Sequence, residues 1–201
     1  MLAPSVLPSD LTSITDTLDA VDQDASSLVA GLDDAQFNWQ PDKRQWSIAQ
    51  CLDHLTRANS GYLDAMRAAA ARARTADLVR RGPIEPGFLS RLFINSIGPE
   101  SSMRYRSPSS AAPARSDLRK EEVLPAFLRI QEDVRAFAQA CADLDLNRAR
   151  FANPFVRAVR FSVGTGLLVI AAHDRRHLSQ AHRVREASAF PGHAVLRCDA
   201  D

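Results

Sequence analysis

The sequence predicts an all-α protein, an antiparallel four-helix bundle with a long connection between its second and third helices. Four segments carry apolar residues at alternating spacings of three and four, the pattern of one face of an amphipathic helix. No segment shows a convincing alternating strand pattern, and the nearest, VRAVRFSV, is short. A chain of 201 residues that is 45% hydrophobic is long enough to bury a core. We therefore expect residues 1–201 to form one domain.

The first two helices are predicted at about 9–33 and 47–75. Ser9 is the candidate N-cap of the first. Its apolar stripe is Leu11, Ile14, Leu18, Val21, Ala25, Leu28 and Leu32. The second helix opens with Ser47-Ile-Ala-Gln, which has the S-x-x-Q form of a capping box, and Trp46 stands before the cap as an apolar N′ residue. Its stripe is Ile48, Leu52, Leu55, Tyr62 and Met66.

The connection at about 76–114 is expected to be mainly irregular, because it contains five of the eleven prolines and three of the eight glycines. The segment FLSRLFINSIG inside it is compatible with a short helix. A third long helix is predicted at about 117–143, with Ser116 as an early cap and Pro125 tolerated only near its first turn or at a kink. A fourth is predicted at about 164–187.

The formal charge of +1 conceals an uneven distribution. Residues 1–42 contain eight Asp and no Lys or Arg, whereas arginines are concentrated in the last quarter. Complementary faces within one fold explain this most simply. A nucleic-acid interface would depend on arginines 148, 150, 157 and 160 interleaved with Phe151, Phe155 and Phe161, but a balanced total charge attracts phosphates weakly over distance. We therefore expect no nucleic-acid partner.

A cytoplasmic location without membrane contact is expected. No apolar run approaches the roughly 20 residues of a membrane-spanning helix, and the first residues have neither the basic nor the apolar region of a signal peptide. Three widely spaced cysteines, Cys51, Cys141 and Cys198, match neither a disulfide framework nor a metal knuckle. Reduced thiols are the expected state.

Three histidines carry the chemistry that the sequence indicates. His173 and His177 lie four residues apart on the seam of the fourth helix, where a bundle normally places Leu or Ile. Residues at this spacing lie above one another on the same face, so their two rings can chelate one ion at about 2.0–2.1 Å. His54 shares its helix face with small side chains that leave room for a neighbour. From the residues alone, a metal site and a cluster of hydrogen-bonded core histidines both remain open.

Other residues near these histidines are weaker candidates. The sequence HDRRH differs from the zincin signature, because Asp174 stands where that motif requires Glu as a general base. We interpret Asp174 as a surface salt-bridge residue rather than an outer partner of the site. Cys51 is a fourth-ligand candidate, although a free cysteine inside a helix is more often a small apolar core residue. Asp53 is not convincingly placed as a base.

Two segments resemble the DinB-like family. WQPDKRQWSIAQCLDHL at 39–55 resembles the W-x-P…WSIxxxLxHL stretch, and Asn153-Pro154 followed by HDRRHLSQ at 173–180 resembles the NP…HxxRHxxQ ending, so that the similarity spans nearly the whole chain. The resemblance implies an up-down-down-up four-helix bundle that pairs as a homodimer. It also implies that His54, His173 and His177 are the ligands of one divalent ion: nickel, zinc or iron. It implies neither polymerase activity nor DNA binding.

Three histidine ligands leave coordination positions open, which is typical of a catalytic site acting on a small molecule. The first hypothesis is a thiol-dependent S-transferase-type enzyme in which the metal lowers the pKa of a low-molecular-weight thiol. A metal-dependent hydrolase is the close variant, and a non-enzymatic, stress-associated metal-binding scaffold is the alternative. Arg57, Arg175 and Arg176 either bind carboxylates of an anionic thiol or form a solvated face. We expect the 76–114 connection to cover the metal pocket and to set substrate choice.

Overall fold

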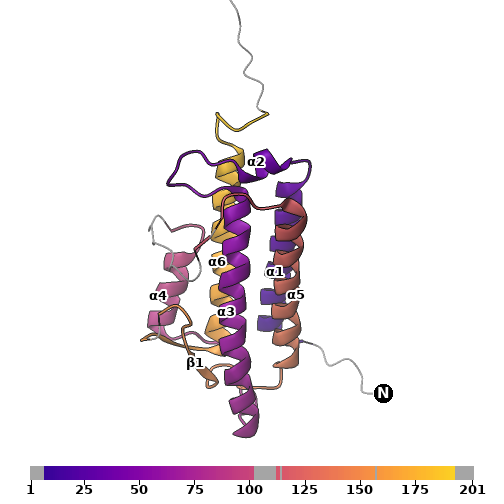
Figure 1. Ribbon diagram of the computed structural model, residues 1–201. Coiled ribbons are helices and arrows are strands. Elements are labelled where there is room, and N and C mark those ends of the chain that lie inside the picture. Colours follow the sequence, from indigo (N-terminus) through magenta and orange to yellow (C-terminus); the bar gives the residue numbers. More distant parts are fainter. Residues whose placement is uncertain (1–6, 102–111, 114, 157, 193–201) are drawn as a thin grey trace, which may run out of the picture.

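The computed structural model describes residues 7–101, 112–113, 115–156 and 158–192. Its frame is four long helices, α1 (Ser9–Val29), α3 (Ile48–Thr75), α5 (Lys120–Ala140) and α6 (Val163–Arg185). α1 and α3 each pack against both α5 and α6. In Figure 1, α1 and α6 run in one direction while α3 and α5 run in the other, which is the up-down-down-up order. The all-α prediction is confirmed.

The first predicted helix, at about 9–33, ends a few residues early in the structure, and a short second helix follows it. α1 ends at Val29, and Gly31 then adopts a φ of 75°, a left-handed conformation that stops the helix. Asp33 starts the short α2 (Asp34–Asn38) with a capping box, because its side chain accepts a hydrogen bond from Gln36 N while the Gln36 side chain accepts one from Asp33 N. Pro8, rather than Ser9, occupies the N-cap of α1.

α3 begins as its sequence predicts, whereas α5 begins later. Ser47 and Gln50 form the predicted capping box, with both hydrogen bonds at 3.1 Å. α5 starts at Lys120, and the residue before it, Arg119, makes no side-chain cap. Ser116 therefore caps nothing, and Pro125 lies inside the second turn of the helix.

Two connections contain regular structure, and the sequence indicated the helix in the first but not the strands in the second. In the 76–114 connection, α4 (Phe88–Ile97) packs against α6, and Arg80 fastens the preceding loop by binding the Asp10 carboxylate at 2.7 Å. Strands β1 (Arg150–Ala152) and β2 (Arg160–Ser162) form an antiparallel hairpin that pairs Phe151 with Phe161. Our expectation of no strand was wrong here, because three-residue strands are too short for a recognisable alternation. Both phenylalanines are buried, so neither is available to stack on a nucleic-acid base.

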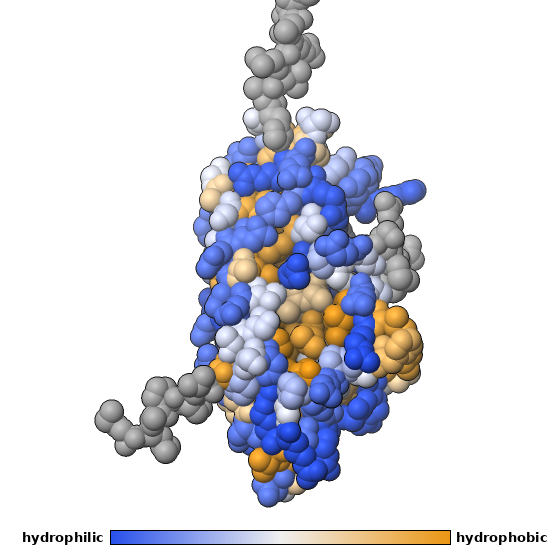
Figure 2. All heavy atoms as spheres, turned by 180° about the vertical axis from the view of Figure 1, so that it is seen from behind, coloured by the Kyte–Doolittle hydropathy of each residue, from blue (hydrophilic) through white to orange (hydrophobic). Residues whose placement is uncertain are grey.

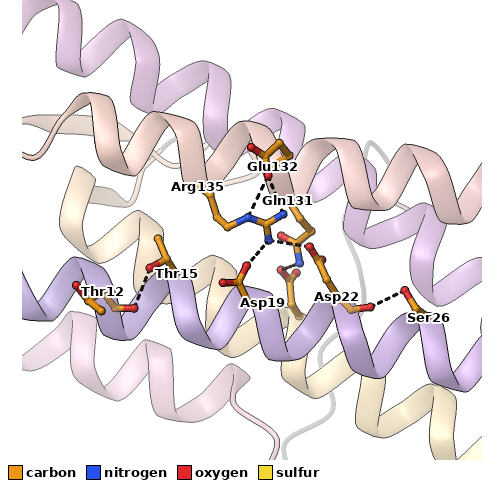
Figure 3. A network of polar contacts seen from close by, with 9 residues as sticks. Thr12, Thr15, Asp19, Asp22, Ser26, Gln131, Glu132 and Arg135 are labelled. Carbon is orange, nitrogen blue, oxygen red and sulfur yellow. Dashed lines mark hydrogen bonds and ion pairs between the residues drawn. The ribbon is translucent and has the colours of Figure 1, made fainter. Parts of the chain in front are cut away.

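The acidic N-terminal helix meets basic side chains of its neighbours. Figure 3 shows Arg135 of α5 between Asp19 and Asp22 of α1, with Glu132 beside it. Arg135 Nη1 lies 2.7 Å from Asp22 Oδ2, and a little further along α1 His182 Nε2 lies 2.7 Å from Asp24 Oδ1. These contacts support the interpretation of the uneven charge as complementary faces within one fold.

Exposed apolar side chains gather on α4, where Phe88, Leu89 and Leu92 are largely exposed. Figure 2, seen from behind, shows hydrophobic residues at the edge that α4 forms. None of the helices in the described part of the chain is both long and apolar enough to cross a membrane. Cys51 and Cys141 are buried free thiols, and Cys198 lies outside the described residues.

Candidate metal centre

The fold brings the three predicted histidines together from two helices. His54 lies in the second turn of α3, and His173 and His177 lie one turn apart on α6. His173 Nε2 is 3.3 Å from His54 Nε2 and 3.1 Å from His177 Nε2. The three imidazoles offer one ligand atom each, and these atoms all lie within 4.8 Å of one another.

The two separations that involve His173 fit a common metal ligand sphere. Two nitrogens that each lie about 2.05 Å from one ion and 3.1–3.3 Å from each other subtend an angle of about 98–107° at the ion. This range falls between octahedral and tetrahedral geometry. The rings stand at 65–81° to one another, so their edges converge and their faces do not stack. The donor set therefore suits a divalent ion that accepts imidazole, such as zinc, nickel or iron.

The environment keeps the α6 histidines neutral, which is the form that binds metal. Burial, together with the positive forms of His54 and Arg176, lowers the pKa of His173 to about 3. Burial also lowers the pKa of His177 well below its usual range, with additional contributions from His173, His54 and Arg176. Both rings therefore present free lone pairs at neutral pH.

Trp46 covers the histidines on one side. Its indole stacks on His177 with ring centroids 5.5 Å apart and 19° between the planes, and it lies 4.8 Å from the ring of His54. The capping box at Ser47 fixes the start of α3 and so holds this indole over the site. We predicted Trp46 only as an N′ residue; its position at the start of the helix that carries His54 was the available signal.

Arg176 and Arg57 are engaged by the protein. Arg176 Nη1 donates to the carbonyls of Ser96 at 3.2 Å and Gly98 at 3.3 Å, so it ties the C-terminal end of α4 to α6 beside His177. Arg57 binds Asp53 at 2.9 Å on the surface of α3. The described part of the 76–114 connection thus reaches the site through Arg176.

Asp174 lies inside the molecule, so the interpretation of it as a surface residue was wrong. Its side chain has no exposed area and accepts hydrogen bonds from the amides of Asn59 and Gln131 at 3.0–3.1 Å. Burial raises its pKa to about 7, and the two amides oppose this shift. Asp174 lies beside the His173 seam, and the buried face of α6 is wide enough to include it.

Cys51 does not join the histidines. It is buried in the core, and burial raises the pKa of its thiol to about 12. Among the described residues, no Cys, Asp or Glu side chain completes a larger metal-binding group with the triad. Within the described part of the chain, the candidate site therefore consists of three imidazoles.

The sequence model of the DinB superfamily matches residues 17–181, a range that includes all three histidines. A relative in Bacillus subtilis (strain 168), the uncharacterized protein YuaE, is 22% identical over 158 residues, which cover 78% of this chain and 87% of the relative. No solved structure matches the chain significantly.

Proposed function

The chain belongs to the DinB superfamily, and we propose that His54, His173 and His177 hold one divalent ion: zinc, nickel or iron. We infer further that the protein is an enzyme that joins a low-molecular-weight thiol to a small electrophile. The observation that carries this proposal is the convergence of three imidazole nitrogens with no fourth ligand among the described residues. A bound ion would supply Lewis acidity that lowers the pKa of a thiol or a water molecule.

The side chains of the site favour an external thiol as nucleophile. The pKa values of Cys51 and Cys141 are both raised by burial, so neither supplies a thiolate at neutral pH. Asp53 is engaged by Arg57 and Asp174 by amides, so neither is free to act as the base that water attack requires. In the proposed reaction the thiol releases its proton to solvent. Its sulfur then bonds to an electrophilic carbon, and the leaving group departs with the electrons of its broken bond.

The surroundings of the triad have separate roles in this proposal. The indole of Trp46 shields His54 and His177 from water on one side. Arg176 anchors the α4 end of the 76–114 connection, which we propose as the border of the substrate site. A homodimer remains part of the proposal because it is the association that the family resemblance implies.

Metal content tests the proposal first. Protein purified without a histidine tag should contain about one equivalent of metal by plasma mass spectrometry, and His173→Ala should contain none. His182→Ala is the matched control, since this histidine lies on the same helix and pairs with Asp24 instead of the triad. A wild type without metal, even after addition of zinc or nickel, would refute the site.

Activity tests the reaction separately. The metal-loaded protein should accelerate consumption of a panel of low-molecular-weight thiols by a chromogenic alkylating electrophile, and His173→Ala should not. Ester or amide hydrolysis without thiol consumption would replace the transferase with the hydrolase. A metal-loaded protein that is inactive in both assays would contradict an enzyme and favour the scaffold.

A further inference from the structure

One buried carboxylate links three of the four long helices. Asp174 of α6 accepts hydrogen bonds from Asn59 Nδ2 of α3 on both oxygens, at 3.0 and 3.1 Å, and from Gln131 Nε2 of α5 at 3.0 Å. None of the three side chains is exposed. We call Asp174, Asn59 and Gln131 the register clamp.

The clamp joins the two helices that carry the histidines at the level of the histidines. Asp174 follows His173 directly on α6, and Asn59 lies a turn and a half after His54 on α3. A slip of one residue would move a helix by about 1.5 Å and rotate it by about 100°. Metal–ligand distances tolerate only about 0.2 Å. The triad therefore needs α3 and α6 held in one axial alignment.

The clamp carries a free-energy cost, so stability alone does not explain it. Asn59 Oδ1 and Gln131 Oε1 are buried and have no hydrogen-bond partner among the described residues, because both amides turn their NH₂ groups to the carboxylate. An unpaired buried acceptor costs about 1–3 kcal/mol. Apolar side chains of similar volume commonly stabilise a core as well or better than buried polar networks do. A network with this cost is better explained by the alignment it specifies.

We propose that Asp174, Asn59 and Gln131 position α3 and α6 so that His54 converges with His173 and His177 on one metal ion. This inference rests on the proposed metal site. The three residues are positioning residues: within the described chain, Asp174 hydrogen-bonds to none of the histidines, so it acts through the placement of the helices. Its polar partners on α3 and α5 fix both the height and the rotation of α6.

Gln131→Met gives the sharpest test, because α5 carries no ligand and methionine has a similar volume. Titration with Co²⁺, followed by its visible absorption bands, measures both the dissociation constant and the coordination geometry. We expect the dissociation constant to rise about 10-fold, the equivalent of about 1.4 kcal/mol, and the absorption bands to change shape. Asn59→Leu, which removes two of the three hydrogen bonds, should have the larger effect.

Val134→Ala is the matched control for a purely structural role. Val134 is fully buried on α5, one turn from Gln131, and its apolar side chain takes no part in the hydrogen bonds of the clamp. It should lower the melting temperature of the metal-free protein at least as much as Gln131→Met while leaving the Co²⁺ affinity and spectrum at wild-type values. Wild-type Co²⁺ affinity in Gln131→Met, confirmed as folded by circular dichroism, would overturn the clamp. An equal loss of Co²⁺ affinity in Val134→Ala would also overturn the positioning role of the clamp. A wild type that binds no Co²⁺ would overturn the metal site itself.

Discussion

Gly166 of α6 packs closely against Met66 of α3, and Gly166→Ala should drive the two ligand-bearing helices apart. A Cβ at this position would lie 2.6 Å from Met66 Sδ of α3 and 2.8 Å from Phe151 Cζ of β1. Met66 has no exposed area and Phe151 has 2%, so neither side chain has free space into which it can move. The alanine must therefore displace packed atoms.

Two opposing effects set the magnitude. Overpacking a dense core costs about 1–3 kcal/mol, while alanine gains up to about 1 kcal/mol over glycine in a helix interior. The net expectation is a loss of about 1–2 kcal/mol, which for a chain of this size lowers the melting temperature by about 2–8 °C. Urea unfolding followed by circular dichroism measures the free energy, and thermal melts measure the temperature.

Gly61→Ala on α3 is the control, because it receives the same helix gain with less crowding. Its Cβ would lie 3.1 Å from the ring edge of Phe155, which is only partly buried and can turn aside. This variant should be neutral or slightly stabilised. A Gly166→Ala protein as stable as wild type would show that the α3–α6 contact is looser than the structure indicates.

Three further predictions address the site and its support. In a Trp39→Phe background, one equivalent of paramagnetic Co²⁺ should quench most of the Trp46 fluorescence, since the indole stacks on His177 at 5.5 Å; unchanged emission at full occupancy would place the ion elsewhere. In chelator-treated protein, the pKa of His173 is about 3, below its ordinary 6.5, so its neutral form contributes stability that is complete above pH 6.5 and is lost as the pH falls. Wild type should therefore lose about 1 kcal/mol relative to His173→Ala between pH 7.5 and 5.5 in urea titrations, and parallel pH profiles would contradict the buried neutral ring. Arg135→Ala should destabilise the protein by about 3 kcal/mol at pH 7, because it leaves the mostly buried carboxylate of Asp22 unpaired. Burial raises the pKa of Asp22, so the loss of stability should shrink at pH 5. A loss below about 1 kcal/mol at pH 7 would indicate an ordinary surface pair.

Local signals made the helices and the triad predictable. A stripe of apolar residues reports the buried face of a helix without knowledge of its partners, and the Ser47 capping box specifies the start of α3. His173 and His177 were recognisable because two polar rings replaced apolar residues on a seam. Their convergence with His54 depends on how α3 packs against α6, and the family resemblance supplied that step.

The end of the first helix and the β1–β2 hairpin depend on tertiary contacts, which local sequence patterns do not show. The first stripe continues to Leu32, which is buried although the helix stops at Val29, because the chain turns at Gly31 and still covers the core. The hairpin at 150–162 is held by the pairing of Phe151 with Phe161 across nine intervening residues. A three-residue strand has too few positions to show a period of its own.

Asp174 was misinterpreted, although the apolar stripes of α3 and α5 contain the signal that places it in the core. Asn59 lies four residues after Leu55, and Gln131 lies four residues after Phe127, so both amides stand on the apolar stripes of their helices. A polar residue in such a position must find a buried partner, and a short acidic side chain on a neighbouring helix is the natural one. If stability alone were optimised, leucine or methionine would serve better at both positions. The positions of the two amides on these stripes therefore indicate that the alignment of α3 and α6 is specified at a cost in stability.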